Sequence, residues 1–395
     1  MIHVSYAKTV YGQKEIDAVV RCLKEGTQMG KYSREFETKI AGLFEKKYCL
    51  YVNSGSSALC IGMESFGFEK GAEVITPALT FSTTVGSIVK AGLVPVFVDV
   101  GEANYCINPE KIEEIISPKT VAIVAPNLIG NICEWDKISA IAKKYNLKIL
   151  EDSADTLGGT LHGKPSGHWS DISITSFYGS HIINCAGNGG ALCVNDLEYL
   201  RRAKLLRSWG RSSSIFDEKS EKIENRFNVD VDGISYDAKF VFETIGYNLE
   251  GSEIGAAFGL EQLKDLEQNI EMRRKNFQIQ SNFFRRYEEF FTLPKETSGA
   301  RSGWLAFPII VKKSAPFARR DFQIFLEKKN IQTRVVFTGN ITRQPGFKNL
   351  EMRKSADLKN SDNIMRGGVL LACHHGLNDE MIAHMHSVVE EFLKL

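Results

Sequence analysis

Short apolar segments alternate with amphipathic helical segments through the first half of the chain, and this alternation restricts the possible folds more than any other feature. The apolar segments lie at residues 73–77, 95–100, 121–126 and 147–152. Apolar residues at helical spacing lie between them, as at 110–116 and 136–146. Strands that are apolar on both faces belong to parallel sheets covered by helices on both sides. The sequence therefore predicts an α/β fold with a buried, mostly parallel sheet.

The rest of the chain extends this pattern into two domains. Helical spacing precedes the first strand at residues 12–26 and 33–47, and strand-like segments follow at 172–178 and 189–194. A polar stretch at 212–233 reads as a surface excursion, and two long amphipathic helices are expected at about 252–270 and 272–291. We place a large domain at residues 1–270 and a smaller C-terminal α/β domain at 271–395.

Charge and composition exclude several classes of partner. Lys and Arg number 49 against 48 Asp and Glu, without a basic cluster, which argues against a nucleic-acid partner. The chain has neither a signal-like start nor a run of 18 apolar residues, so we expect a cytoplasmic protein without a membrane segment. The eight cysteines are scattered without a C-x-x-C pair, which favours reduced thiols over disulfides or a metal site.

The sequence NSGSSAL, residues 53–59, forms a small polar turn between a strand-like segment and a helix expected to begin near Ser57. Unpaired backbone N–H groups and the helix dipole make such a helix start suitable for a phosphate, and Gly55 allows an anion to approach the backbone closely. A plain helix cap is the competing interpretation.

A second candidate lies in ILEDSADTLG, where an apolar strand ends in Glu151 and Asp152. Ligands of open α/β sheets bind at the carboxyl ends of the strands, where Asp152 could pair with a protonated ring nitrogen. An Asp that caps a loop gives the same pattern, so both interpretations remain open.

The third motif, SITSFYGSHIINCAGNGGALCVND, makes the pattern specific. Together with NSGSSAL and EDSADTLG, in this order, it resembles the DegT/DnrJ/EryC1/StrS family of sugar aminotransferases and dehydratases. The resemblance covers nearly the whole chain and implies the fold of type I pyridoxal phosphate (PLP) enzymes, which resembles aspartate aminotransferase. In that family a turn after a Ser-Phe strand end carries the lysine that binds the cofactor covalently. Ser176 and Phe177 match this strand end, but His181 occupies the lysine position.

The resemblance also implies roles for individual residues. Asp152 would hold the pyridine nitrogen, Phe81 would stack on the ring, and Asp155 would lie near the ring hydroxyl. The phosphate would be held by Ser56, Ser57 and Ser176. Asn248 in GYNLE resembles a residue that reaches the phosphate of a neighbouring subunit, which implies a homodimer.

Histidine in place of lysine changes the expected chemistry. An imidazole does not form a stable covalent link with the cofactor aldehyde, so the cofactor should bind noncovalently, most usefully as pyridoxamine phosphate (PMP). Imidazole has an ordinary pKa near 6.5, which suits it to proton transfer at neutral pH. The resemblance implies the 3-dehydratase branch, which removes the C3 oxygen of nucleotide-linked 4-keto-6-deoxyhexoses, with His181 as the base.

Some members of that branch hold a two-iron, two-sulfur cluster through a cysteine. The equivalent positions here are Ala154 and Ser212–Ser214, so we expect no iron–sulfur cluster. Cys185 and Cys193 do not match the ligand positions. Without a cluster, two routes remain open. Either hydrolysis releases the product and glutamate restores the aminated cofactor, or a separate reductase supplies electrons.

Several further residues are weaker candidates. Tyr178 could contact the cofactor or the sugar, although an aromatic residue at a strand end could equally belong to the core. Arg334, Asn340 and Arg343 could clamp a pyrophosphate, or could form a solvated basic loop. The adjacent His374 and His375 would point to opposite faces of an extended segment, so we expect a structural role, or at most a contact with the substrate, rather than a shared metal ion.

These observations lead to one main hypothesis and two alternatives. The main hypothesis is a homodimeric, PMP-dependent 3-dehydratase acting on a nucleoside-diphosphate sugar. An ordinary sugar aminotransferase with some other amine is one alternative, and an inactive cofactor-binding homologue is the other. The nucleotide and the hexose are left open by the sequence.

Overall fold

The central element is a twisted eight-stranded sheet. The computed structural model describes residues 2–216, 223–227 and 229–395. The strands are ordered β1-β9-β8-β5-β4-β2-β3-β15, and only β9 runs antiparallel to its neighbours. Their bounds are Tyr48–Val52, Gly190–Val194, Ile172–Ser176, Lys148–Asp152, Thr120–Pro126, Glu73–Pro77, Val94–Val98 and Arg353–Lys354. The predicted mostly parallel α/β architecture is confirmed.

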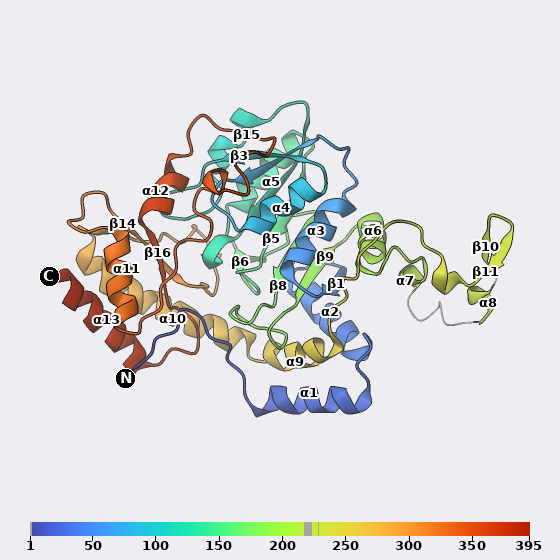
Figure 1. Ribbon diagram of the computed structural model, residues 1–395, viewed down its shortest axis with the longest axis horizontal. Coiled ribbons are helices and arrows are strands. Elements are labelled where there is room, and N and C mark those ends of the chain that lie inside the picture. The colour runs from blue at the N-terminus through green and yellow to red at the C-terminus, as the bar shows by residue number, and fades with distance from the viewer. Residues whose placement is uncertain (1, 217–222, 228) are drawn as a thin grey trace.

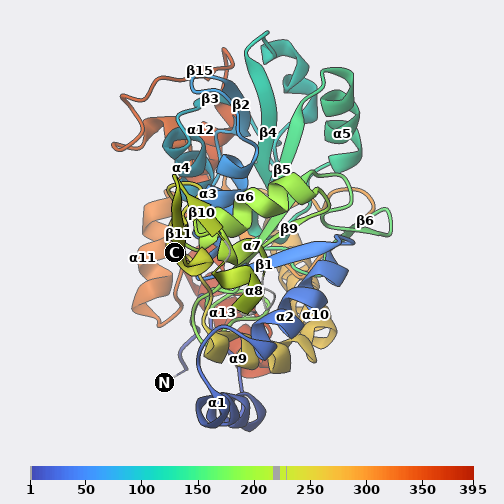
Figure 2. The same cartoon turned by 90° about the vertical axis from the view of Figure 1, so that its right-hand side faces the viewer.

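Helices cover both faces of this sheet (Figures 1 and 2). Leu50 and Val52 of β1 pack on one face with α3 (Gly55–Ser65) and α6 (Leu197–Arg207), whereas Cys49 and Tyr51 pack on the other with α2 and α9. Strand residues alternate between the faces, so each face forms its own apolar core. The remaining helices of this part are α1 (Gln13–Glu25), α2 (Lys31–Leu43), α4 (Ser82–Lys90), α5 (Trp135–Lys144) and α9 (Glu253–Leu263), with short 3-10 turns η1 (Pro109–Lys111), η2 (Glu113–Ile115) and η3 (Leu128–Gly130).

The C-terminal part has its own sheet, of order β12-β14-β16 (Phe291–Thr292, Phe307–Val311, Gly368–Leu371). It packs with η6 (Arg285–Tyr287), α11 (Arg319–Lys328), α12 (Lys359–Gly367) and α13 (Asp379–Leu393). Val4 pairs with Ile331, so the N-terminal segment joins this part, while β15 crosses to the large sheet. A third small sheet joins β13 (Ala300–Arg301), β6 (Thr160–Leu161) and β7 (Lys164–Pro165).

The expected boundary at residue 270 falls inside α10 (Leu266–Phe284), which connects the two parts. The expected bounds of the two helices, 252–270 and 272–291, are wrong. The helical conformation is interrupted earlier, at Lys264 and Asp265, between α9 and α10. The apolar pattern continues across this break, so periodicity alone did not reveal it.

The polar stretch after α6 is an excursion away from the body of the molecule (Figure 1). Its described parts are α7 (Ser213–Phe216), α8 (Ile223–Arg226), the hairpin of β10 (Val229–Val231) and β11 (Ile234–Tyr236), and η5 (Ala238–Phe240). The expected excursion is confirmed for these residues, and 217–222 and 228 lie outside the described residues. None of the helices in the described ranges has the length and apolar character needed to cross a bilayer.

The first turn of α2 is capped by a residue from another helix. The N-cap of α2 is Gly30, which offers no side chain. Instead the buried Glu253 carboxylate of α9 accepts from the backbone N–H groups of Gly30 and Tyr32, at 2.8 and 2.7 Å, and from the Ser33 hydroxyl at 2.6 Å. The carboxylate thus satisfies N–H groups that a helix start leaves without partners, and fixes α2 against α9.

Replacing this carboxylate should destabilise the fold. We expect Glu253→Ala to lower the free energy of unfolding by about 3 kcal/mol, because buried N–H groups lose their acceptor. Urea denaturation followed by circular dichroism measures the change. Glu261→Ala is the matched control on the same helix, since among the described residues Glu261 forms ion pairs with Arg21 and Lys264, whose side chains are exposed. Equal loss in both variants would contradict the capping role.

Candidate active site

The predicted residues gather where the carboxyl ends of the parallel strands meet. Strand β5 ends at Asp152 and β8 ends at Ser176, while β1 leads directly into the NSGSSAL turn. Val52 and Ser176 both pair with Gly190, so these strand ends lie level with each other. The sheet therefore brings segments more than a hundred residues apart in sequence to one edge.

The NSGSSAL turn forms the start of α3, which begins at Gly55, two residues before the expected start. The Ser54 hydroxyl accepts from the Ser57 N–H at 3.1 Å, and the Ser57 hydroxyl donates to the Asn53 side chain at 2.6 Å. A Cβ on Gly55 would lie 2.7 Å from the Cβ of Ser176, so only glycine allows β8 this close. The predicted phosphate residues Ser56, Ser57 and Ser176 thus lie around one helix start, which also carries a plain serine cap.

Asp152 is buried at this edge with 5% of its surface exposed. Its carboxylate accepts from the Thr84 hydroxyl at 3.0 Å and from the Ala154 N–H at 3.1 Å. Burial raises the pKa of Asp152 to about 7, and the nearby Asp155 adds to the shift. A protonated ring nitrogen beside this carboxylate would favour its charged form, so the site suits a pyridinium cation.

Phe81 lies at the start of the helix whose Thr84 contacts Asp152, and Asp155 lies near Asp152 itself. Phe81 is the N-cap residue of α4 and has 49% of its surface exposed, so its ring face is available to a planar ligand. Asp155 accepts from the Ile129 N–H at 2.9 Å, and burial raises its pKa to about 7. Ile129 has a φ of 62°, a strained conformation for a β-branched residue. Such strain occurs where the surroundings fix the backbone, as they do beside Asp155.

His181 lies in the turn after β8 with one ring nitrogen engaged and one free. Its Nδ1 is 3.0 Å from the Ser176 carbonyl oxygen, and its Nε2 is 3.7 Å from Asp155 Oδ1. A carbonyl only accepts hydrogen bonds, so Nδ1 carries the proton and the lone pair is on Nε2. Burial lowers the pKa of His181 to about 4, and the charge of Arg273 contributes. At neutral pH the imidazole is therefore an uncharged base directed towards Asp155.

Arg273 of α10 holds the His181 turn and escaped the sequence prediction. Its buried guanidinium donates to the carbonyl oxygens of Ser180 and His181, at 3.2 and 3.1 Å. The signal was present, because residue 273 lies on the stripe of α10 that also carries the buried Ile270, Gln280 and Phe284. A buried arginine on such a stripe indicates a structural or functional partner.

Tyr178 and Asn248 are both exposed. The Tyr178 side chain has 59% of its surface exposed, and its ring centroid lies 6.1 Å from that of His181, so its interpretation as a core residue is wrong. Asn248 pairs with Ser208 in an isolated bridge, and the adjacent Leu249 accepts from the Asn53 N–H at 3.0 Å. Asn248 therefore lies on a segment beside the α3 turn of its own chain.

The predicted pyrophosphate clamp is occupied by a carboxylate of this chain. Asp362 accepts from Asn340 at 2.8 Å and pairs with the Arg343 guanidinium, and Asn340 is 2% exposed. The Arg334 guanidinium stacks on the Tyr6 ring instead. Asn340 and Arg343 therefore both contact the Asp362 carboxylate, and their role as a pyrophosphate clamp stays a prediction.

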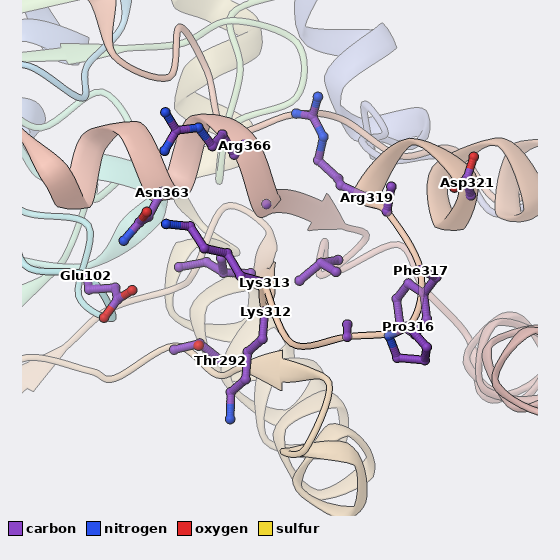
Figure 3. A pocket seen from close by; sticks show the side chains of 15 residues that line it. Glu102, Thr292, Lys312, Lys313, Pro316, Phe317, Arg319, Asp321, Asn363 and Arg366 are labelled. Carbon is purple, nitrogen blue, oxygen red and sulfur yellow. The ribbon is translucent and has the colours of Figure 1, made fainter.

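His374 and His375 have separate structural partners, as expected. His374 Nε2 lies 3.0 Å from the Ser5 carbonyl oxygen, and His375 Nδ1 accepts from Arg273 at 3.1 Å. In the described ranges no group of three or more His, Cys, Asp or Glu side chains could hold a metal ion. A cavity of about 640 Å³, lined by Lys312, Lys313 and Arg366 among others, contains none of the predicted site residues (Figure 3).

The arrangement of these residues fits the expected cofactor. A buried carboxylate, a half-exposed aromatic ring and a serine-rich helix start are placed for a pyridine nitrogen, a ring face and a phosphate respectively. The position after the Ser-Phe strand end holds an imidazole, which lacks the primary amine for a covalent link.

Known proteins share this sequence and fold. The chain is 34% identical to a dTDP-4-dehydro-2,6-dideoxy-D-glucose 3-dehydratase of Saccharopolyspora spinosa, over 92% of this chain and 80% of that protein. It is 30% identical to a GDP-4-keto-6-deoxy-D-mannose 3-dehydratase of Yersinia pseudotuberculosis, over 99% of both chains. Among solved structures, the E. coli GDP-4-keto-6-deoxy-D-mannose-3-dehydratase with bound hydrated PLP superposes with a TM-score of 0.87 at 26% identity, covering 98% of this chain and 100% of that one.

The family model described as the DegT/DnrJ/EryC1/StrS aminotransferase family matches residues 10–390. The match covers every strand of the described residues and every predicted site residue. The chain therefore belongs to this family and has the aspartate-aminotransferase-like fold of its PLP enzymes.

Proposed function

We propose that the protein is a PMP/PLP-dependent 3-dehydratase that removes the C3 hydroxyl of a nucleoside-diphosphate 4-keto-6-deoxyhexose in the cytoplasm. The observation that carries this proposal is His181, a neutral imidazole in the position of the family's covalent lysine, with Nε2 directed towards Asp155. Two relatives that are at least 30% identical are named as 3-dehydratases of 4-keto sugars.

Most residues of the site would bind the cofactor, and His181 would transfer a proton. Asp152 would hold the ring nitrogen, Phe81 the ring face, and Ser56, Ser57 and Ser176 the phosphate. When bound, PMP supplies an amine that condenses with the 4-keto group and a conjugated ring that accepts electrons. His181 Nε2 would take the proton from the carbon that carries this amine, which drives loss of the C3 hydroxyl. Tyr178 would face the sugar from the exposed side of His181.

The absence of iron–sulfur ligands favours hydrolysis of the dehydrated product. The equivalent positions hold Ala154 and Ser212–Ser214, which offer no thiolate. We propose that hydrolysis releases ammonia and a 3-deoxy-4-keto sugar, and that glutamate then restores PMP. A dependence on an added reductase, with no response to glutamate, would assign the other route.

An aminotransferase remains the alternative, since the family description includes that activity. It would need a lysine amine within reach of the cofactor. Lys46 is the buried lysine in the described part of the chain, and its Nζ donates to the Ser170 carbonyl at the amino-terminal end of the sheet. Borohydride reduction that fixed the cofactor covalently to wild-type protein would favour this alternative, whereas failure to fix it favours the dehydratase.

Replacing His181 tests the central claim. We expect His181→Asn to lower the rate of C3 deoxygenation at least roughly 100-fold, because the proton acceptor is lost. The cofactor should still bind, as measured by its absorbance after gel filtration. Mass spectrometry of the sugar product measures turnover, and His168→Asn, at an exposed histidine paired with Glu45, is the control. Wild-type turnover by His181→Asn would remove His181 from the mechanism.

We also propose that the protein is a homodimer in which Asn248 reaches the partner's phosphate site. Large apolar side chains are exposed throughout the excursion and the segment after it. They are close together along the chain, whereas exposed apolar residues on an ordinary surface are scattered singly. They are Phe216, Ile223, Phe227, Val231, Ile234, Tyr236, Phe240, Phe242, Ile245 and Tyr247. Such a surface suits burial against a second copy of the chain.

A charge placed in this surface should weaken the dimer. Ile245 has 92% of its surface exposed, and we expect Ile245→Asp to raise the dimer dissociation constant at least roughly tenfold. Sedimentation equilibrium measures this change. Ile324→Asp introduces the same charge at a 40% exposed position on α11 and should leave the dimer unchanged. A monomeric wild-type protein, or equal effects of the two substitutions, would contradict the proposed interface.

A further inference from the structure

Four hydrogen bonds and one longer contact form a ring that includes the His181–Asp155 pair. Asp155 accepts from the Ile129 N–H at 2.9 Å, and the Ile129 carbonyl accepts from the Leu305 N–H at 2.8 Å. The Leu305 carbonyl accepts from Arg273 at 3.2 Å, and Arg273 donates to the His181 carbonyl at 3.1 Å. The ring closes across the 3.7 Å between His181 Nε2 and Asp155 Oδ1.

Within this ring, Arg273 connects the His181 turn of the large domain to the C-terminal part of the molecule. Its five N–H groups have five acceptors: the carbonyls of Ser180, His181, Trp304 and Leu305, and His375 Nδ1. The guanidinium is fully buried, and all five acceptors are uncharged. Its fork therefore fixes the His181 turn relative to the C-terminal part.

The opposite side of the ring is equally constrained. A Cβ on Gly130 would lie 2.7 Å from the Cα of Trp304, so the Ile129–Gly130 turn packs directly on the backbone of the C-terminal part. Gly130 has a φ of 97° and Ile129 one of 62°, which only a fixed environment maintains in a β-branched residue. Asp155 is thus held by a turn that packs on the Trp304–Leu305 backbone, and Arg273 donates hydrogen bonds to that backbone.

We propose that Arg273 is a positioning residue that holds the His181 imidazole against Asp155 through this ring. The inference rests on the proposed role of His181 as the base. A catalytic base misplaced by about 1 Å loses roughly 100-fold in rate, so the geometry of the pair is a requirement for turnover.

The charge of Arg273 has a second effect on the same imidazole. The groups that face His181 are Asp155 near Nε2, Tyr178 at the exposed side and Arg273 beneath the turn. Asp155 also interacts electrostatically with Tyr6 and with Arg273, so these two groups are part of the surroundings of the pair. A nearby cation disfavours protonation of the imidazole, so Arg273 contributes to the lowered pKa of His181.

The test compares Arg273→Lys, Arg273→Met and the control Arg274→Met in the holoenzyme. Arg274 is the adjacent arginine on α10 and pairs with Glu296 near the surface. Titration of His181 by NMR, assigned with His181→Asn, reports its pKa independently of turnover. We expect Arg273→Met to raise this pKa towards 6.5, Arg273→Lys to keep it low because the charge remains, and Arg274→Met to leave it unchanged.

Turnover provides the second measurement. We expect Arg273→Lys to lower kcat roughly 100-fold with little change in KM. A lysine amine cannot hydrogen-bond the His181 turn and the Trp304–Leu305 backbone at the same time. An unchanged His181 pKa in Arg273→Met, or wild-type kcat in Arg273→Lys, would overturn the proposal. If wild-type protein fails to dehydrate any 4-keto sugar, the proposed function fails, whereas the NMR titration still decides the role of Arg273.

Discussion

A buried guanidinium with only uncharged partners is the interaction on which the site depends most. Moving a charged group out of water costs several kcal/mol, and here no carboxylate touches the cation to offset that cost. Five hydrogen bonds from Arg273 do so instead, and they join the His181 turn, the backbone at Trp304 and Leu305, and His375. Helix α10 therefore does more than connect the two parts of the chain. Through Arg273 it fixes the position of the C-terminal part relative to the turn that carries the candidate base.

Much of the site could be predicted because local sequence determines where strands end. Asp152 is the last residue of a short apolar strand, and the carboxyl ends of parallel strands share one edge, so its place near Ser176 follows from topology alone. The position of the serine-rich turn could also be predicted, since a small polar segment before a helix is typical of a helix start. The alternating strands and helices likewise determined the α/β fold.

What could not be predicted depends on partners distant in sequence. The pairing of Asn340 and Arg343 with Asp362, on a different helix, could not be seen in the sequence. The break between α9 and α10 was missed because apolar residues continue at helical spacing through Lys264 and Asp265. Tyr178 was ambiguous because an aromatic residue at a strand end packs inwards or outwards according to tertiary surroundings.

In the proposed mechanism, a different charged group would favour each protonation state of His181. Before proton transfer, burial and the cation of Arg273 favour the neutral imidazole, and the Ser176 carbonyl fixes the lone pair on Nε2. After the proposed proton transfer, Nε2 would carry a proton that faces Asp155 Oδ1, and the carboxylate form of Asp155 would stabilise an imidazolium. A lysine in this position would present a flexible ammonium, without a second nitrogen to anchor its orientation. In the proposed mechanism, the imidazole would thus combine a fixed direction with a base that both accepts and returns a proton, as a noncovalently bound cofactor would require.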